Sequence, residues 1–242
     1  MLDKKTVFRF KQFDIIQLVN IMKVNTDGIL LGAWSQIEGK KNILDIGTGT
    51  GLIALMLAQR TIGATVTGIE IDLPSAEEAA LNMSNSRFGG RLNCIHTSIQ
   101  DFARDDTSKF DLIVSNPPFF SGGTFSTNEN KANVRHTQKL SHIDLLNSVR
   151  TLLSPDGHFD LILPYIEGLR FLEMGEKYDF KCAHITEIRS KDRRPVERLL
   201  IRLGQSPVKK VKNDTLIMMN HGEGYDYSSS FIKLTKDFYL SF

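Results

Sequence analysis

The sequence has 242 residues, of which 41% are hydrophobic and 24% charged, a balance typical of a globular protein with one sizeable core. Its 30 Lys and Arg and 28 Asp and Glu give a formal net charge of +2, which does not by itself indicate a polyanion partner. Cys94 and Cys182 lack metal-ligand spacing, and no apolar run reaches the roughly 20 residues that span a bilayer. We therefore expect one cytoplasmic domain over residues 1–242, without a disulfide framework, a metal or a membrane span.

The first 40 residues predict an extension ahead of the main fold. Residues 8–17 begin with alternating aromatic and polar side chains, the pattern of a short strand or ribbon. A helix is predicted over 26–34, where Thr26 or Asp27 is suited to cap the first turn and apolar residues follow at once.

From residue 43 onward, strand-like and helical periods alternate, as they do in successive βα units. An apolar run at 43–46 leads through Gly47, Gly49 and Gly51 into a helix over 52–58. Further strands are predicted at 66–71, 92–96, 110–115 and 157–164, with helices at 74–81, 144–153 and 168–178. Two more alternations, at 183–188 and 198–203, predict a hairpin that closes the sheet. The fold class is therefore α/β, with a mostly parallel sheet and one long connection at 120–139 of the kind that is usually functional or disordered.

Ligands of open α/β sheets bind beyond the carboxyl ends of the strands, so the residues at those positions carry the functional prediction. The glycines at 47, 49 and 51 allow close approach of a ligand to the backbone, although their spacing differs from the GxGxxG of dinucleotide binders. Glu70 follows about 20 residues later, where an acidic side chain accepts ribose hydroxyls. Asp101 follows the next strand and is suited to accept from an adenine amine. Together these residues predict a ligand that contains adenosine.

The fourth strand ends in Asn116, Pro117, Pro118 and Phe119, the most specific motif of the chain. An amine conjugated to a planar ring is a poor nucleophile because its lone pair is delocalised. The Asn116 side-chain oxygen and the Pro117 carbonyl are two acceptors on a stiff backbone, suited to hold the two N–H groups of such an amine. Phe119 offers a face on which a base stacks. The motif therefore predicts methyl transfer to a planar amino nitrogen.

These residues, in this order, resemble the class I S-adenosylmethionine-dependent methyltransferases that act on planar amino nitrogens. Residues 10–13, 23–34 and 234–240 extend the resemblance, and they look like those of the bacterial tRNA1(Val) adenine-37 N6-methyltransferases. The resemblance covers nearly the whole chain. It implies a Rossmann-like, seven-stranded sheet with the last strand antiparallel, helices on both faces, and S-adenosylmethionine over the glycine turn. One departure is Phe119, where the family often has tyrosine.

The resemblance also assigns the site residues by position. Asn116, Pro117, Pro118 and Phe119 are expected to be catalytic, with the target amine held by the first two. The expected cofactor-binding residues are Asp27, Asp45, Gly47, Thr48, Gly49, Gly51, Glu70, Ile71, Asp101 and Asn116.

The implied partner is tRNA, bound by a monomer at an adenine of its anticodon loop. Positive charge gathers near the end of the chain, which predicts contacts to the RNA backbone. The expected RNA-binding residues are Arg135, His136, Arg193, Arg194, Arg198, Lys209, Lys210 and Lys212.

Three alternatives stay open on the sequence. The Asn-Pro-Pro-Phe motif also occurs in rRNA guanine N2-methyltransferases, and its two acceptors would equally orient a protein glutamine amide. A glutamine enzyme usually carries a separate recognition domain, for which the roughly 40 residues ahead of the glycine turn are too few. A noncatalytic RNA-binding protein with the same fold is the alternative of a different class.

Overall fold

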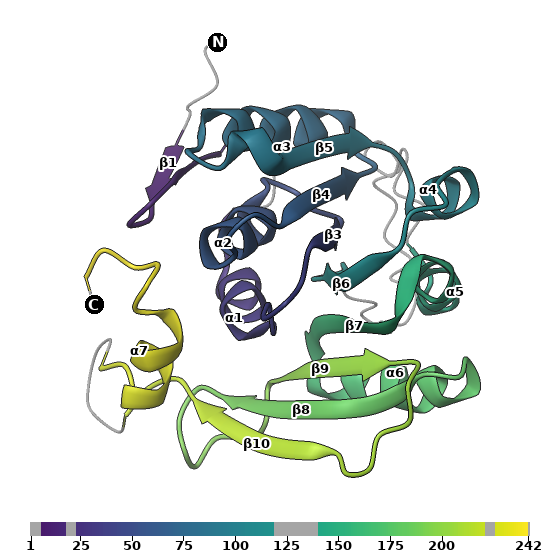
Figure 1. Ribbon diagram of the computed structural model, residues 1–242. Coiled ribbons are helices and arrows are strands. Elements are labelled where there is room, and N and C mark those ends of the chain that lie inside the picture. The colour runs from purple at the N-terminus through teal and green to yellow at the C-terminus, as the bar shows by residue number, and fades with distance from the viewer. Residues whose placement is uncertain (1–5, 18–22, 119–139, 221–225, 242) are drawn as a thin grey trace, which may run out of the picture.

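The computed structural model describes residues 6–17, 23–118, 140–220 and 226–241. Its centre is one eight-stranded sheet, in the order β10-β8-β9-β7-β6-β3-β4-β5 (Figure 1). The strands are β3 (Asn42–Ile46), β4 (Thr65–Glu70), β5 (Leu92–His96), β6 (Phe110–Ser115), β7 (Leu153–Pro164), β8 (Lys181–Arg189), β9 (Arg198–Gly204) and β10 (Lys212–Ile217).

The strand directions confirm a mostly parallel sheet and correct its predicted edge. β9 is antiparallel to both of its neighbours, β7 and β8, whereas β10 pairs in parallel with β8. The sheet therefore has eight strands rather than seven, and its antiparallel strand is followed by one more. β10 joins the edge by backbone pairing, from Lys212 opposite His184 to Ile217 opposite Arg189. The predicted hairpin at 183–188 and 198–203 is confirmed as β8 and β9.

Helices cover both faces of the sheet, as predicted. α1, α2, α3 and α7 lie on one face and α4, α5 and α6 on the other (Figure 1). Their bounds are α1 (Thr26–Trp34), α2 (Leu52–Arg60), α3 (Leu73–Asn85), α4 (Ile99–Asp105), α5 (His142–Leu152), α6 (Tyr165–Lys177) and α7 (Ser229–Thr235), with a short 3-10 turn at Gly89–Arg91. Among the described residues, no helix has the length and apolar character to cross a membrane.

The predicted ribbon near the N-terminus is a hairpin of β1 (Thr6–Arg9) and β2 (Asp14–Gln17). It is fixed to α3 by Asn82, whose side chain accepts from the backbone N–H of Ile16 at 2.9 Å and donates to the Ile16 carbonyl at 3.0 Å. Asn25, and neither Thr26 nor Asp27, caps α1, because its side-chain oxygen accepts from the backbone N–H of Gly28 at 2.8 Å.

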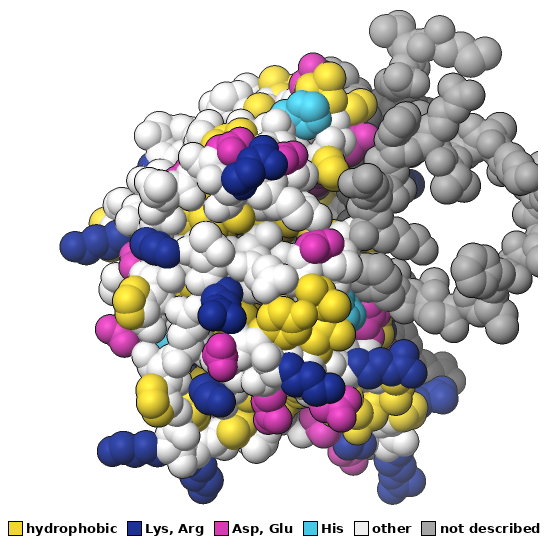
Figure 2. Space-filling view, turned by 90° about the vertical axis from the view of Figure 1, so that its right-hand side faces the viewer, with side chains coloured by type: hydrophobic (Ala, Val, Ile, Leu, Met, Phe, Trp, Pro, Cys, Tyr) yellow, Lys and Arg dark blue, Asp and Glu magenta, His cyan; other side chains and the backbone are white. Residues whose placement is uncertain are grey.

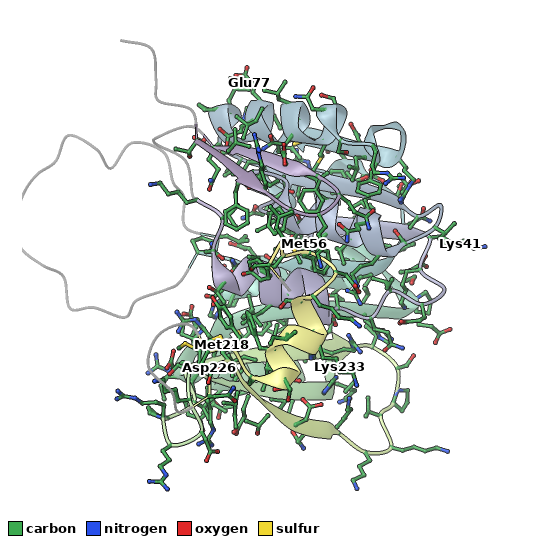
Figure 3. The ribbon with its side chains drawn as sticks, turned by 90° about the vertical axis from the view of Figure 1, so that its left-hand side faces the viewer. Lys41, Met56, Glu77, Met218, Asp226 and Lys233 are labelled. Carbon is green, nitrogen blue, oxygen red and sulfur yellow. The ribbon has the colours of Figure 1, made fainter. Side chains whose placement is uncertain are left out.

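Two cores sandwich the sheet, because successive side chains of each strand point to opposite faces. Ile43 of β3 packs with α1 and α2, whereas the next residue, Leu44, packs with α4, α5 and α6. Met56 of α2 lies in the interior of the first core, while Glu77 and Lys41 point outward (Figure 3). Burial on both faces explains why apolar residues predominate in the central strands β3 and β6.

The order of the strands reverses between β3 and β6. From β3 the chain adds β4 and β5 on one side, and then β6 and β7 on the other. Ligands of doubly wound sheets bind at this switch point, beyond the carboxyl ends of the strands. The topology therefore brings the turn after β3 beside the segment after β6.

Candidate active site

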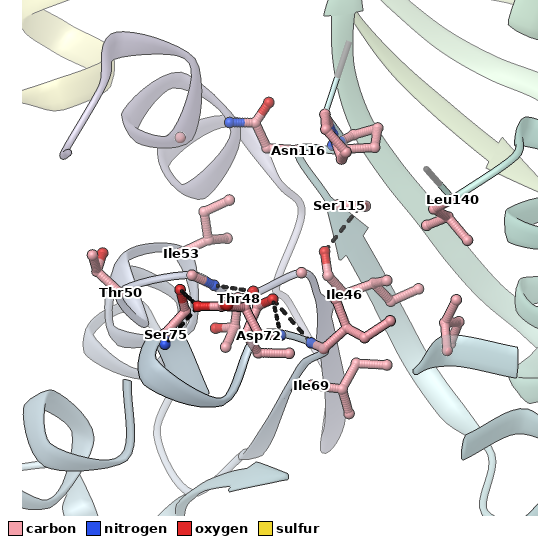
Figure 4. Close-up of a pocket in the computed structure, with 18 of the residues that line it drawn as sticks. Ile46, Thr48, Thr50, Ile53, Ile69, Asp72, Ser75, Ser115, Asn116 and Leu140 are labelled. Carbon is pink, nitrogen blue, oxygen red and sulfur yellow. Dashed lines mark hydrogen bonds between the residues drawn. The ribbon is translucent and has the colours of Figure 1, made fainter. Parts of the chain in front are cut away.

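The ends of β3 and β6 are joined directly. Ile46 and Ser115 are register partners, and the Ser115 hydroxyl donates to the Ile46 carbonyl at 3.0 Å (Figure 4). A cavity of about 850 Å³ opens at this edge of the sheet. It is lined by the glycine turn, the ends of β4 and β5, the start of α4, and Asn116, Pro117 and Pro118. The structure thus brings together in one cavity most of the strand-end residues selected from the sequence.

The glycine turn has two parts with different roles. Gly47 and Gly49 have φ angles of 70° and 56°, line the cavity, and would have no atom within 4 Å of an added Cβ. They form a cradle whose open side leaves room for a ligand. Gly51, with φ of 82°, lies against α3 instead, where an added Cβ would be 3.4 Å from Met83 Cε. We therefore assign Gly51 to helix packing, in contrast to the cofactor contact expected from its motif.

Glu70 holds the turn to the start of α3. Its Oε2 accepts from the backbone N–H of Gly49 at 3.0 Å, and its Oε1 accepts from those of Ile71 and Asp72 at 2.9 and 3.1 Å. An ionised carboxylate has about four lone-pair positions, so a position remains for a ribose hydroxyl. Glu70 and Ile71 both line the cavity, as a cofactor contact requires. The bracing of the turn is a second role that the sequence did not indicate.

Asp101 also lines the cavity, from the first turn of α4 rather than from a strand end. Its Oδ2 accepts from the Ser98 hydroxyl at 2.6 Å, and its Oδ1 lies 2.9 Å from Nη2 of Arg104. These contacts favour the charged form, since the Ser98 hydrogen bond and then Arg104 lower the pKa of Asp101. An ionised acceptor is therefore held at the cavity wall.

Asp45 supports the site from behind. It is fully buried, and its Oδ2 accepts from the hydroxyl of Thr48 at 2.7 Å, which fixes the turn from inside. Thr48 reaches the cavity wall, whereas Asp45 is not among the lining residues. We therefore assign Asp45 to bracing, in contrast to the direct cofactor contact expected from the sequence.

Burial raises the pKa of Asp45 from 3.8 to about 7. Because the folded state holds this proton more tightly than the unfolded chain, the free energy of unfolding decreases as pH rises through this range. Relative to an Asp45→Asn variant, wild-type stability is expected to decrease by on the order of 2–3 kcal/mol between about pH 5 and pH 8. Urea denaturation of both proteins across this range measures the difference. If the free energies of unfolding of the two proteins change with pH in parallel, the raised pKa of Asp45 is contradicted.

Asn116 carries an acceptor that lacks a donor. Its Oδ1 is buried, and no described group donates a hydrogen bond to it. A buried acceptor left unpaired costs about 1–3 kcal/mol, and a donor bound at Asn116 would remove that cost. Pro117 beside it is buried and Pro118 is exposed, while Phe119 lies outside the described residues. The role of Asn116 and Pro117 in holding an amine stays a prediction.

Asp27 faces a different cavity. A second hollow, of about 570 Å³, shares Asn25, Asn116, Pro117 and Pro118 with the first and is also lined by Asp27 and Arg198. Nε of Arg198 donates to Asp27 Oδ2 at 3.0 Å, a contact between residues 171 positions apart. Asp27 is not among the residues that line the larger cavity, although Asn25 and Gly28 near it are, so its expected cofactor contact stays a prediction.

The basic residues selected from the sequence fall at two opposite edges of the sheet. Arg193 and Arg194 are exposed on the turn between β8 and β9, at the carboxyl edge that holds both cavities. Lys209 and Lys210 lie between β9 and β10, at the other edge, because β9 runs antiparallel. Arg135 and His136 lie outside the described residues.

The sequence did not indicate several lining residues. Lys23, Asn25 and Leu140 contribute to the larger cavity from segments that flank helices, and His96 contributes from the end of β5. The rule of reading strand ends would have found His96, whose Nε2 lies 3.0 Å from the Ile71 carbonyl. In the described part of the chain, no group of three His, Cys, Asp or Glu side chains could hold a metal ion.

A glycine cradle, an acidic side chain at the next strand end and an amine acceptor at the switch point together define a class of protein, the methyltransferases. The family model for the methyltransferase small domain matches residues 25–162. The tRNA1(Val) (adenine(37)-N6)-methyltransferase of Photobacterium profundum is 41% identical, over 96% of this chain and 98% of its own length. Its counterpart in Haemophilus influenzae is 40% identical, over 97% and 99%. The chain belongs to the tRNA1(Val) (adenine(37)-N6)-methyltransferase family, which confirms the resemblance seen in the sequence.

Solved structures show the same fold. A predicted O-methyltransferase from Agrobacterium tumefaciens matches with a TM-score of 0.70 at 18% identity, over 88% of this chain and 96% of its own. The 16S rRNA N2 G1207 methyltransferase of T. thermophilus, solved with AdoMet and guanosine, matches with a TM-score of 0.58 at 22% identity, over 85% and 51%. At these identities the likeness establishes the fold alone.

Proposed function

We propose that this protein transfers the methyl group of S-adenosylmethionine to the exocyclic N6 amine of adenine 37 in the anticodon loop of tRNA1(Val). The observation that carries the proposal is the position of Asn116 and Pro117 in the lining that the two cavities share, with Oδ1 of Asn116 accepting from no described group. The names of the relatives supply the substrate, and the geometry of this chain supplies the means of orienting its amine.

The residues of the larger cavity fit S-adenosylmethionine. Gly47 and Gly49 leave open space that an added Cβ would take, and Glu70 and Asp101 offer acceptors for a ribose and an adenine amine. When bound, the cofactor supplies a methyl group already activated by a positively charged sulfur. The protein therefore needs to position the acceptor rather than to activate the donor.

Asn116 and Pro117 orient the amine. Each carbonyl oxygen accepts one N–H of the N6 group, so that the nitrogen lone pair is turned out of the ring plane toward the methyl carbon. When the methyl group passes from the sulfur to N6, the carbon–sulfur bond breaks and the nitrogen becomes cationic, so both acceptors interact more strongly with its N–H groups than in the ground state. The amide of Asn116 is neutral and takes no proton, so the proton leaves to water. Turning the base out costs little in a loop that is already unpaired.

Contacts to the RNA backbone are proposed for the carboxyl edge of the sheet. Acidic and basic side chains are interspersed over the face that carries α4, α5 and α6 (Figure 2), so that face does not provide a continuous basic surface. Arg193 and Arg194 are exposed beside the second cavity.

Replacing Arg193 and Arg194 together by Ala is expected to reduce the slope of log affinity against log salt by about 1 to 2, because each phosphate contact releases counterions. The matched pair Lys209→Ala and Lys210→Ala, at the opposite edge, is expected to leave the slope near its wild-type value. Filter binding of tRNA across a salt series measures both. An unchanged slope for the arginine pair would contradict their assignment.

Methyl transfer to two tRNA1(Val) transcripts tests the function. One carries adenine at position 37 and the other guanine, and a radioactive methyl donor reports the transfer. We expect transfer to the first transcript only. Transfer to the guanine transcript at a comparable rate would support the N2-guanine alternative, and transfer to neither would support a noncatalytic role.

A further inference from the structure

The second cavity lies directly beside the proposed position of the target amine. It shares Asn25, Asn116, Pro117 and Pro118 with the cofactor cavity, so these residues form a wall between the two. Its remaining lining comes from the start of α1, the end of β8, the start of β9 and the residue after β10. Leu30, Ile188 and Met218 give it an apolar lining suited to a planar base. A base in this cavity presents its amine to the shared wall.

An aligned ion pair lies in the wall of this cavity. Nε of Arg198 donates to Asp27 Oδ2 at 3.0 Å, and Nη1 donates to the Glu197 carbonyl at 3.0 Å. The side chain of Asp27 is 18% exposed and that of Arg198 is 33% exposed. The backbone of Arg198 is fixed as well, since it is paired in register with Pro164 and Ile188. The direction of the planar guanidinium is therefore set before any ligand binds.

The charge of the lining favours a neutral base over a phosphate. Arg198 is the one cation among the described lining residues, and Asp27 and Glu197 are two carboxylates. The local field of this set does not attract a phosphodiester. This distinguishes Arg198 from Arg193 and Arg194, with which it was grouped on the sequence as a backbone contact.

We propose that Arg198, positioned by Asp27, is a specificity-determining residue that donates a hydrogen bond to a ring nitrogen next to the target amine. This inference rests on the proposed function. N6 of adenine is flanked by N1 and N7, which are both acceptors, and a guanidinium is a donor only. N2 of guanine is flanked by N1–H, a donor that opposes Arg198, and by N3. Turning N3 toward Arg198 brings the ribose to that side. The cavity therefore selects adenine over guanine, whereas the Asn-Pro-Pro-Phe motif alone does not distinguish the two bases.

Replacing single atoms of the target base tests the contact. Three tRNA1(Val) substrates carry adenosine, 1-deazaadenosine or 7-deazaadenosine at position 37, and kcat/KM is measured with the wild type and with Arg198→Met. We expect one of the two deaza bases to lower wild-type kcat/KM by about 10-fold or more. Arg198→Met is expected to lose activity with adenosine and to be insensitive to that same deaza base, because the two changes remove one interaction.

Two further variants complete the experiment. Arg193→Met removes an exposed positive charge nearby. It is expected to lower kcat/KM by the same factor for all three substrates, so its sensitivity to the deaza base should equal that of the wild type. Asp27→Asn keeps the guanidinium but loosens its alignment, so the deaza base should still lower its kcat/KM, by less than in the wild type. This variant provides the test if Arg198→Met does not fold.

If the loss of kcat/KM caused by the deaza base is as large in Arg198→Met and Asp27→Asn as in the wild type, the two changes are independent and the inference is overturned. An equal loss with all three substrates together with a reduced salt slope would indicate a phosphate contact and would also overturn it. Wild-type protein that does not methylate the adenosine substrate would instead overturn the proposed function, and the inference with it.

Discussion

Replacing Asn116 by Ala is expected to lower kcat for methyl transfer by a factor on the order of 10² to 10³, because it removes one of two groups that turn the amine lone pair toward the methyl carbon. The dissociation constant of S-adenosylmethionine should change little, since Gly47, Gly49, Glu70 and Asp101 hold the cofactor in the proposed arrangement. Single-turnover transfer and calorimetry measure the two quantities separately.

Asn116→Asp is the matched control for this prediction. It keeps an oxygen at the same position with almost the same shape, so it is expected to retain far more transfer than Asn116→Ala. If both variants lose transfer equally, the acceptor oxygen is not what matters. If Asn116→Ala turns over like the wild type, the assignment of this residue is wrong.

Gly49→Ala is expected to raise the dissociation constant of S-adenosylmethionine by about 10- to 100-fold. The φ angle of 56° is unfavourable for any residue with a Cβ, which costs about 1–2 kcal/mol of stability. The added Cβ meets no protein atom within 4 Å, so it projects into the space assigned to the cofactor. Crowding a filled site costs a further 1–3 kcal/mol or so, which corresponds to the loss of affinity.

Gly63→Ala separates these two effects. Gly63 has a φ angle of 87°, an added Cβ there also meets nothing within 4 Å, and the residue is exposed between α2 and β4, away from the cavity. This variant should lose comparable stability and bind cofactor normally. Calorimetry with the two variants measures both effects, and equal affinities would contradict the cradle. Wild-type protein that binds tRNA but no cofactor would favour the noncatalytic alternative.

Much of the fold follows from short-range pattern. The parallel strands β3 and β6 are buried over most of their length, and apolar residues predominate in both until glycine or polar residues begin. Because carboxyl ends of parallel strands meet at one edge, the same pattern placed Gly47, Glu70 and Asn116 at one cavity. Fold class and cavity were therefore within reach of the sequence.

The additional edge strand β10 could not be predicted from the sequence. β10 begins with four exposed residues, Lys212 to Thr215, and has no apolar alternation to detect. Its pairing depends on β8, with which it makes backbone contacts and a polar contact between Asp214 and His184 at 3.1 Å. An edge strand of this composition reads from sequence as a solvated basic loop.

Contacts between residues far apart in the sequence could not be predicted either. Asp27 lies in the first turn of α1 and Arg198 at the first position of β9, and only the folded sheet brings them to 3.0 Å. The roles of Gly51 and Asp45 were assigned from a motif, which identifies a turn but does not distinguish the residues that face the ligand from those that support them. Burial provides that distinction.

The central claim is that the two acceptors at the switch point orient the N6 amine of an adenine. Methyl transfer to total tRNA from a strain that lacks the enzyme, followed by nucleoside mass spectrometry, tests it most directly. We expect N6-methyladenosine to appear with wild-type protein and to be nearly lost with Asn116→Ala. Formation of N2-methylguanosine in its place would contradict it.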